Sequence, residues 1–410
     1  MSVRFEMPPV SVVAAALRKT TEHLAAEVVK SSTSPPDWSD VEWAIARSAV
    51  AMQGTSALLA NNVEWSGPPA WLAFLAEQRE QGVKRHARIG ALLERIDAVA
   101  RARGIACVAL KGAALRALDL YRPGERPMAD VDLLVAARDL QAIADAMADI
   151  DYVDAFTTQR HRVFESRHKL AARGYAEHVD NPLKIEVHTA VAELLPVRKV
   201  DITEGLKSGR ERPGLNNYPD LVSLLVHLLL HAAGNMRAHA LRQIQLHDIA
   251  LVGGLLYDRD WGQLLELRHD GEAPWWLYPP LALTARYYPN HIPVDVLRAA
   301  RAACPGILRL AAGRHSLTDV SWSNLRIHAF PGIAWSRTPV DAWRFVRSRV
   351  LPSGTSLAEL EIARRAQPQL DAVPWYGVSH GRRIARWLFS RPPRVQTIVS
   401  VIAALRDDRV

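Results

Sequence analysis

Two aspartates one residue apart form the most informative chemical pattern in this sequence. Asp130 and Asp132 lie in the segment 130–135 (DVDLLV), whose other residues are apolar and predict a short buried strand. Because side chains alternate along a strand, both carboxylates leave the same face, with their α-carbons about 6–7 Å apart. Carboxylates this close repel each other, and hard divalent cations are their usual partners. Paired cations suit phosphoryl or nucleotidyl transfer, whereas a solvated strand end is the alternative for the pair taken alone.

A third carboxylate and a Lys-Gly turn extend this pattern. Glu186 and His188 alternate with apolar residues in the segment 183–188, so a strand there places both side chains on one face. Lys111-Gly112 follows a predicted strand and precedes a predicted helix, where backbone N–H groups and a lysine can hold phosphate oxygens. Glycine at this turn also lets a ligand approach the backbone closely. The alternative is an ordinary strand-to-helix turn with a solvated lysine.

Other polar residues have two interpretations each. Arg126 precedes Asp130 by four residues and would either neutralise phosphates or be a solvated loop residue. His227 and His231 are one helical turn apart, which is a metal-ligand spacing. Only leucines separate the two histidines at positions 228–230, so the glutamate of a zinc-protease motif is missing. We therefore favour packing or hydrogen bonding for both histidines.

The elements that must position these residues form a compact α/β unit over residues 104–192. Short apolar runs bounded by glycine or polar residues predict strands, and longer stretches between them predict helices. The predicted strands are 105–110, 130–135 and 183–188, with weaker candidates near Phe156 and over 161–165 and 175–179, and the predicted helices are 113–120 and 139–150.

Both flanks of this unit are predicted to be helical. Apolar residues at helical spacing predict helices over about 8–30, 37–62 and 69–103, and again over 219–233, 241–256, 260–268, 279–288 and 295–303. The fold class is therefore α+β, with a small mixed-sheet core between mostly helical regions. We divide the chain into a helical region 1–103, the core 104–192, a helical domain 193–330 and a basic, Trp- and Arg-rich tail 331–410.

Composition excludes several classes of protein. The chain of 410 residues is 49% hydrophobic and 23% charged, which is typical of a soluble globular protein. Its two cysteines, Cys107 and Cys304, exclude a disulfide scaffold and a cysteine-rich zinc module. The longest uncharged apolar stretch, 221–236, has 16 residues and is shorter than the roughly 20 that a membrane span needs. We expect a cytoplasmic protein without integral membrane association, because the N-terminus also lacks the charge order of a signal peptide.

Several segments together resemble the nucleotidyltransferase superfamily with the polymerase-beta-like fold. Within it, the chain is similar to an uncharacterised bacterial nucleotidyltransferase family with an LKG…R…DxDLLV signature and a later E-x-H strand. The matching positions are LKG at 110–112, Tyr121, Arg126, DVDLLV at 130–135, EVH at 186–188, Leu241-Arg242 and DIAL at 248–251. The resemblance covers roughly residues 40–260. The phosphate turn commonly contains Gly-Ser or Gly-Gly in the superfamily, whereas this chain has Gly112-Ala113.

The resemblance implies a site and a reaction. Asp130, Asp132 and Glu186 would bind Mg²⁺ or Mn²⁺ ions that bridge the triphosphate of an NTP substrate, and all three would be catalytic. Glu186 would also help to deprotonate an acceptor hydroxyl, which attacks the α-phosphorus and displaces pyrophosphate.

Nucleotide contacts are implied as well. Lys111, Gly112, Arg126 and His188 would contact the nucleotide, with His188 orienting a metal ligand or touching the substrate. Arg242 and Asp248 would form an ion pair between helices or contact the nucleotide.

The acceptor depends on what the basic tail does. Residues 331–410 hold 13 Lys and Arg against six Asp and Glu, with Trp and Arg interleaved at 343–345, 375–376 and 382–394. Such a segment can bind a nucleic-acid backbone or an anionic membrane surface, but we favour an amphipathic helix packed on the body. We therefore expect an acceptor group on a small molecule, a peptide or a protein. The alternatives are a toxin-like transferase that modifies RNA or tRNA and a non-catalytic nucleotide-binding scaffold.

Overall fold

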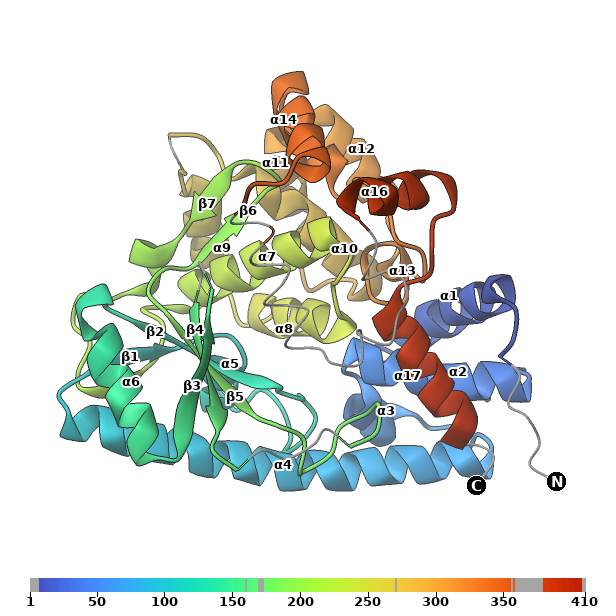
Figure 1. The fold of residues 1–410 in the computed structure, drawn as a ribbon, viewed down its shortest axis with the longest axis horizontal. Coiled ribbons are helices and arrows are strands. Elements are labelled where there is room, and N and C mark those ends of the chain that lie inside the picture. The colour runs from blue at the N-terminus through green and yellow to red at the C-terminus, as the bar shows by residue number, and fades with distance from the viewer. Residues whose placement is uncertain are drawn as a thin grey trace.

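A mixed β-sheet with a long helix beside it forms one part of the molecule, and helices from the N-terminal region and from the C-terminal half of the chain form the rest (Figure 1). The structure, a computed structural model, describes residues 7–158, 161–168, 173–269, 271–354, 357 and 379–407. Within these residues a six-stranded sheet has the order β3-β4-β5-β2-β1-β8, formed by β1 (Ala106–Ala109), β2 (Asp130–Val135), β3 (Tyr152–Thr157), β4 (His161–Ser166), β5 (Lys184–His188) and β8 (Gly214–Asn216). A separate hairpin joins β6 (Ala192–Leu194) and β7 (Lys199–Asp201). The β2–β5 and β1–β8 pairs are parallel and the other pairs antiparallel, which confirms the predicted α+β class with a mixed sheet.

The two faces of the sheet have different neighbours. Helices α4 (Pro69–Ala102) and α6 (Leu140–Asp149) cover one face, where their apolar side chains pack against Val131 and Leu133 of β2. Figure 1 shows α4 running along the whole lower edge of the molecule. Because side chains alternate along β2, its two aspartates face away from these helices. The sheet therefore turns its polar face toward the helices that follow it in the chain.

Those following helices form the second core of the protein. They are α7 (Leu221–Ala238), α8 (Gln243–Gly253), α9 (Asp258–Glu266), α10 (Tyr278–Tyr287), α11 (Val294–Ala303), α12 (Gly306–Arg314) and α13 (Leu317–Val320). Leu225 and Leu229 of α7 are fully buried in this core. Helix α7 is long and apolar enough to cross a membrane by length and composition, but 67% of it is buried inside the protein. A helix buried to this extent is part of the core of the protein.

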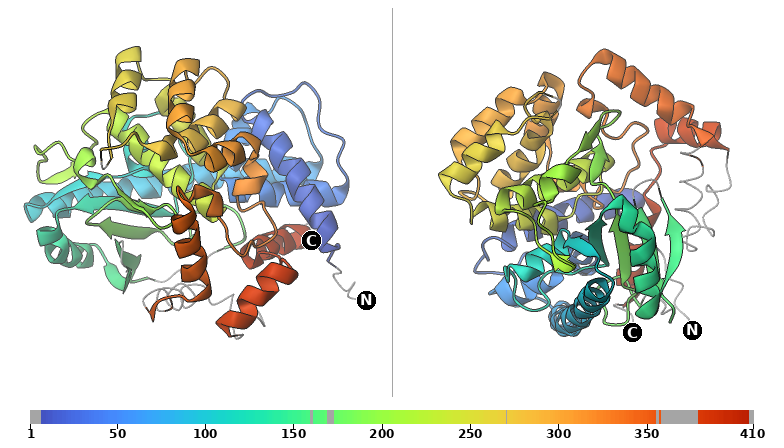
Figure 2. Two further views of the ribbon diagram at one scale, coloured as in Figure 1. Left: turned by 90° about the horizontal axis from the view of Figure 1, so that it is seen from above. Right: turned by 90° about the vertical axis from the view of Figure 1, so that its left-hand side faces the viewer.

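The last helix of the chain packs on a helix near its start. The N-terminal helices are α1 (Val10–Glu27), α2 (Asp40–Gln53) and α3 (Ser56–Asn62), and the C-terminal ones are α14 (Pro339–Val350), α16 (His380–Phe389) and α17 (Val395–Asp407). Helix α17 lies against α2, where Ser48 Oγ and Ser400 Oγ are 2.8 Å apart and Arg47 donates a hydrogen bond to the Ala404 carbonyl at 2.9 Å (Figures 1 and 2). The end of the predicted tail is thus part of the body. The tail residues Trp375 and Tyr376 lie outside the described residues.

Short connecting elements complete the fold. They are α5 (Gly112–Ala117) and the single-turn 3-10 helices η1 (Ala137–Asp139), η2 (Thr203–Leu206), η3 (Trp275–Leu277) and η4 (Ile333–Trp335).

The structure corrects two of the predicted elements. The helix predicted over 37–62 is broken at Gly54, which ends α2 with a φ of 70°, a conformation that glycine adopts without strain. The weak strand predicted over 175–179 is a segment of turns and bends. Its backbone is tied to α4 instead, because Gln78 exchanges two hydrogen bonds with the backbone of Glu177, at 2.9 and 3.2 Å.

Candidate active site

Strand register brings the predicted acidic residues into one row. Strand β5 runs parallel to β2, and Asp132 is directly opposite Glu186. His188 is two residues further along β5 and therefore shares the face of Glu186. On the other side of β5, the antiparallel β4 places His161 opposite His188. The row Asp132, Glu186, His188 and His161 thus crosses three adjacent strands.

Asp132 is the centre of a compact polar network. Its side chain is buried, and its Oδ1 lies 2.9 Å from both Lys111 Nζ and His188 Nε2. Burial raises the pKa of Asp132, but the Lys111 ammonium and His188 outweigh that effect and hold it well below its usual range. In turn, burial lowers the pKa of Lys111, and the larger combined effect of Asp132 and Asp130 raises it. Both partners are therefore ionised at neutral pH.

Nearby cations compensate the burial of the other two carboxylates less completely. Burial, followed by repulsion from Asp132, raises the pKa of Asp130. The same causes, with a further contribution from Asp130, raise the pKa of Glu186 to about 8. A divalent cation among the three side chains would relieve this repulsion, and oxygen is the donor that Mg²⁺ and Mn²⁺ prefer. The donor set of Asp130, Asp132 and Glu186 therefore fits the metal that the resemblance implies.

The turn after β1 aims Lys111 at this row. Lys111 has a φ of 47°, a left-handed conformation that is costly for a residue with a side chain. Its N–H donates to the Tyr218 hydroxyl at 3.1 Å, and that oxygen lies 2.7 Å from Nδ1 of His227 on α7. Helix α7 thus helps to hold the turn in place. This contact also shows a hydrogen-bonding role for His227, as the sequence predicted.

Gly112 is required by the close approach of Arg126. A Cβ at Gly112 would collide with Arg126 Nη1 and would touch the sulfur of Met128. The same guanidinium holds Asp248 through both carboxylate oxygens, at 2.8 and 2.7 Å. Tyr121 donates a further hydrogen bond to Asp248 at 2.6 Å.

The ion pair of Asp248 differs from the prediction. Arg242 and Asp248 both belong to α8 and its N-cap, so they form no pair between helices; the partner of Asp248 is Arg126. Arg242 Nε donates instead to the Met52 carbonyl at 2.9 Å.

His231 is the second histidine of the α7 pair. Its Nε2 lies 3.1 Å from the side-chain amide of Asn235. Burial, followed by the nearby Lys111 ammonium, lowers its pKa to about 3. The side chain is therefore neutral, which agrees with the hydrogen bonding predicted for it.

Two cavities meet at the carboxylate row. The first, of about 270 Å³, is lined by Asp130 and Asp132, by the Lys111-Gly112 turn and by Arg126, among others. The second, of about 160 Å³, is lined by Glu186 and by histidines from the sheet and from α7, which are His161, His188, His227 and His231. Lys111 and His231 line both cavities. A ligand in the first cavity would thus contact the aspartates of the row, and a ligand in the second cavity would contact Glu186 and the histidines.

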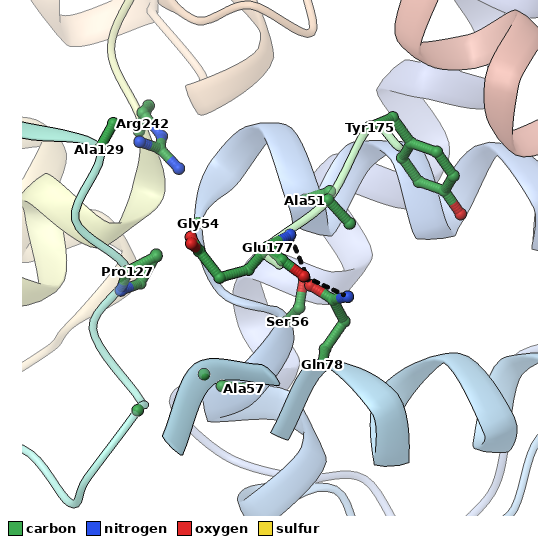
Figure 3. Close-up of a pocket in the computed structure, with 13 residues that line it drawn as sticks. Ala51, Gly54, Ser56, Ala57, Gln78, Pro127, Ala129, Tyr175, Glu177 and Arg242 are labelled. Carbon is green, nitrogen blue, oxygen red and sulfur yellow. Dashed lines mark hydrogen bonds between the residues drawn. The ribbon is translucent and has the colours of Figure 1, made fainter. Parts of the chain in front are cut away.

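A third cavity continues from the first (Figure 3). It measures about 170 Å³ and shares Pro127, Ala129 and Arg242 with the first cavity. Figure 3 shows Arg242 and Pro127 on one side of this space and Gln78 with Glu177 on another. The tyrosine at its edge, Tyr175, points away from this space and stacks on Phe74.

A larger cavity among the described residues lies elsewhere. It measures about 720 Å³ and is lined mainly by loop residues and by α7, including Ile202, Val226 and Trp276. None of the described residues that line it belongs to the carboxylate row. Chemistry rather than size therefore locates the site.

The comparisons with known proteins agree with the chemistry of this site. A family model described as an uncharacterised nucleotidyltransferase matches residues 39–289, which is more than half of the chain. The chain belongs to this uncharacterised nucleotidyltransferase family. The matched region starts one residue before α2 and ends after α10, so it includes the sheet, α7 and α8. No curated protein and no solved structure matched the chain.

His161 was missed by sequence reasoning. It begins a strand that was predicted only weakly, and no local motif marks it. Only the antiparallel register of β4 and β5 brings it opposite His188 and within reach of Glu186. Tyr218 was missed for a similar reason, because its partners Lys111 and His227 come from other elements.

Proposed function

We propose that this nucleotidyltransferase moves an NMP group from an NTP to an acceptor on a small molecule, a peptide or a protein. The observation that carries the proposal is the parallel register of β2 and β5, which places Asp132 beside Glu186 at the Lys111-Gly112 turn. Membership of a nucleotidyltransferase family supports this reaction class. Mg²⁺ or Mn²⁺ at Asp130, Asp132 and Glu186 would neutralise the triphosphate and stabilise the charge that develops during transfer.

The residues around the first cavity would bind the nucleotide. Lys111 is held on Asp132 in this structure, and a cation on that carboxylate would release the ammonium to the phosphates. Gly112 has no side chain, so the Arg126 guanidinium packs directly on the start of α5, at the wall where the phosphates would bind. Arg126, fixed by Asp248, contributes positive charge at the same wall. The nucleoside would extend past Arg242 into the third cavity.

The second cavity is our choice for the acceptor. Glu186 and His188 line it, whereas Asp130 and the Gly112 turn line the first cavity. In-line displacement needs the acceptor oxygen and the leaving pyrophosphate on opposite sides of the α-phosphorus, and the second cavity would give the acceptor its own access to the carboxylate row. Glu186 would help to deprotonate the acceptor hydroxyl. A cavity of this size favours a small acceptor or a single side chain of a peptide or protein. We place this reaction in the cytoplasm.

Incubation with labelled nucleotide tests the proposal. The purified protein is mixed with each α-labelled NTP, Mg²⁺ or Mn²⁺ and a cell extract, and the label is located. We expect transfer of label with release of pyrophosphate. Asp132→Asn should abolish transfer, while Asp145→Asn, a matched change at an exposed carboxylate of α6, should leave it intact. Equal transfer by wild type and Asp132→Asn would show that the site is assigned wrongly.

Modification of RNA is the second candidate, and one surface favours it. Helix α16 exposes Arg382 and Arg386, and Phe389 beside them is 88% exposed. Removing the whole tail would strip α17 from α2, so the test is Arg382→Glu with Arg386→Glu in the full chain. If RNA is the acceptor, tRNA binding should be tight, steeply dependent on salt and lost in this variant. We expect weak binding that the two substitutions do not change.

The third alternative is a scaffold that binds nucleotide without reacting. A scaffold has no need of three carboxylates whose mutual repulsion raises two of their pKa values. Nucleotide binding without any pyrophosphate release would support it.

A further inference from the structure

Two histidines and one glutamate face one another at the edge of the carboxylate row. His161 Nε2 lies 3.5 Å from Glu186 Oε2, and His188 Nε2 lies 3.9 Å from the same oxygen. The three ligand atoms all lie within 4.8 Å of one another. The side chains are 12 to 20% exposed, so they are ordered by packing and still reachable. The second cavity opens in front of them.

These distances match the coordination of a transition metal. Nitrogen and oxygen ligands bind Zn²⁺ at about 2.0–2.2 Å, so two ligands of one tetrahedral ion lie about 3.3–3.6 Å apart. The His161–Glu186 separation is within this range, and the His188–Glu186 separation exceeds it by a few tenths of an ångström. The two histidine nitrogens lie within 4.8 Å of each other, so rotation of the side chains would be needed to bring all three ligands onto one ion. Two imidazoles and one carboxylate are also a common ligand set of catalytic zinc, which leaves a position open for substrate.

The strands supply the rigidity that such a site needs. His161 and His188 are paired across β4 and β5, and Glu186 is two residues from His188 on β5. The ring centroids of His161 and His188 are 4.9 Å apart, so both imidazoles lie on the same face of the sheet. No backbone movement is needed to gather the ligands.

Charge also favours a cation here. His188 Nε2 lies 2.9 Å from Asp132 Oδ1, so a metal at His188 would replace that hydrogen bond and bring Asp132 within reach. Glu186 would then lie between two cations, one held with the aspartates and one held with the histidines. Bridging carboxylates of this kind relieve repulsion among acidic neighbours.

We propose that His161, Glu186 and His188 bind a first-row transition metal ion such as Zn²⁺ in preference to Mg²⁺. Imidazole is a good ligand for such ions and a poor one for Mg²⁺, which selects oxygen. The inference deepens the proposed function, because it names the class of ion at the Glu186 end of the row. Metal binding itself does not depend on transfer, so it can be measured without nucleotide.

Metal titration of the full chain tests the proposal. The metal-free protein is titrated with Zn²⁺, Mn²⁺, Mg²⁺ and Co²⁺ in separate experiments, and binding is followed by calorimetry and by Co²⁺ absorption. We expect one Zn²⁺ per chain, bound at least about tenfold more tightly than Mg²⁺. Co²⁺ should give the visible spectrum of a site with nitrogen and oxygen ligands. Zn²⁺ binding no tighter than Mg²⁺ binding would overturn the proposal.

Variants locate the ion. His161→Gln and Glu186→Gln should each weaken Zn²⁺ binding by about tenfold or more and remove the Co²⁺ spectrum. His178→Gln is the matched control, because His178 lies beside another carboxylate, Asp180, at 3.7 Å. If His161→Gln binds Zn²⁺ as wild type does while remaining folded by circular dichroism, the assignment is wrong.

The two proposals fail in different ways. A protein that binds Co²⁺ through His161 but transfers no nucleotide contradicts only the proposed function. A protein that transfers nucleotide with Mg²⁺, and shows no binding of Zn²⁺ or Mn²⁺ that depends on His161, contradicts only the metal proposal.

Discussion

Asp132 on β2 and Glu186 on β5 are opposite each other in a parallel strand pair, and they have opposite electrostatic environments. Lys111 and His188 hold Asp132 in its ionised form, whereas burial and the neighbouring aspartates raise the pKa of Glu186 to about 8. One carboxylate is thus charged under all physiological conditions, and its neighbour exchanges a proton near neutral pH. Such divergence between adjacent groups is a common property of active sites.

The two aspartates of β2 should respond differently to neutralisation. Asp132→Asn removes charged hydrogen bonds to Lys111 and His188, so we expect the metal-free protein to lose about 1.5–3 kcal/mol of unfolding free energy. Asp130→Asn removes a carboxylate whose pKa is raised, so its stability should be equal to or above that of wild type. Both variants should lose nucleotidyl transfer. Urea unfolding of the pair measures the difference, and a more stable Asp132→Asn would contradict the network described above.

Lys111 should contribute to nucleotide affinity. Lys111→Met keeps most of the unbranched side chain and removes its charge, so NTP binding should weaken by about 1–3 kcal/mol, the scale of one charge-assisted contact. Lys84→Met is the control, because Lys84 forms an exposed pair with Glu80 on α4. Calorimetry with NTP and Mg²⁺ gives both affinities. Unchanged affinity in Lys111→Met would mean that the ammonium stays on Asp132.

Gly112 should not tolerate even a methyl group. Gly112→Ala would push against Arg126 Nη1, which is fixed through Asp248, and should cost about 1–3 kcal/mol of unfolding free energy. NTP affinity should fall as well, because the turn must shift. Gly262→Ala on α9 provides the control, since a Cβ there meets open space and alanine favours a helix. Thermal unfolding of both variants tests this contrast. A Gly112→Ala variant as stable as wild type would contradict the prediction.

His239 should make the protein sensitive to acid. Burial, followed by the neighbouring His328 and Arg394, lowers the pKa of His239 to about 4, against about 6.5 in the unfolded chain. Below pH 6.5 the unfolded state therefore binds a proton that the folded state does not, and stability falls as pH falls. Between pH 7 and pH 5, the unfolding free energy of His239→Asn should therefore fall by about 2 kcal/mol less than that of wild type.

Asparagine suits this position, because His239 ends α7 with a φ of 55°. Chemical denaturation at several pH values measures the effect, and His168→Asn, at an exposed histidine, controls for histidine loss in general. Parallel pH profiles for wild type and His239→Asn would refute the prediction.

The sequence alone determined the elements whose pattern is local. Strand β2 has the predicted bounds 130–135, and α4 ends within one residue of its predicted end. The spacing of apolar residues defines both elements, and a proline marks the start of the helix. Alternation along β2 and β5 also predicts that Asp130 and Asp132 share one face and that Glu186 and His188 share one face, and the strand pairing agrees. The predicted division of the chain at 103, 192 and 330 stays a prediction.

Long-range pairing decided the rest. Arg126 and Asp248 are 122 residues apart, and Ser48 and Ser400 are 352 apart, so no local period connects them. The position of His161 beside Glu186 follows from a strand register, which depends on which edges meet when the sheet forms. The sequence therefore determined which side chains could do chemistry and the faces on which they lie. Only the tertiary structure decided which of them meet, because contacts between distant segments depend on packing across the whole sheet and its helices.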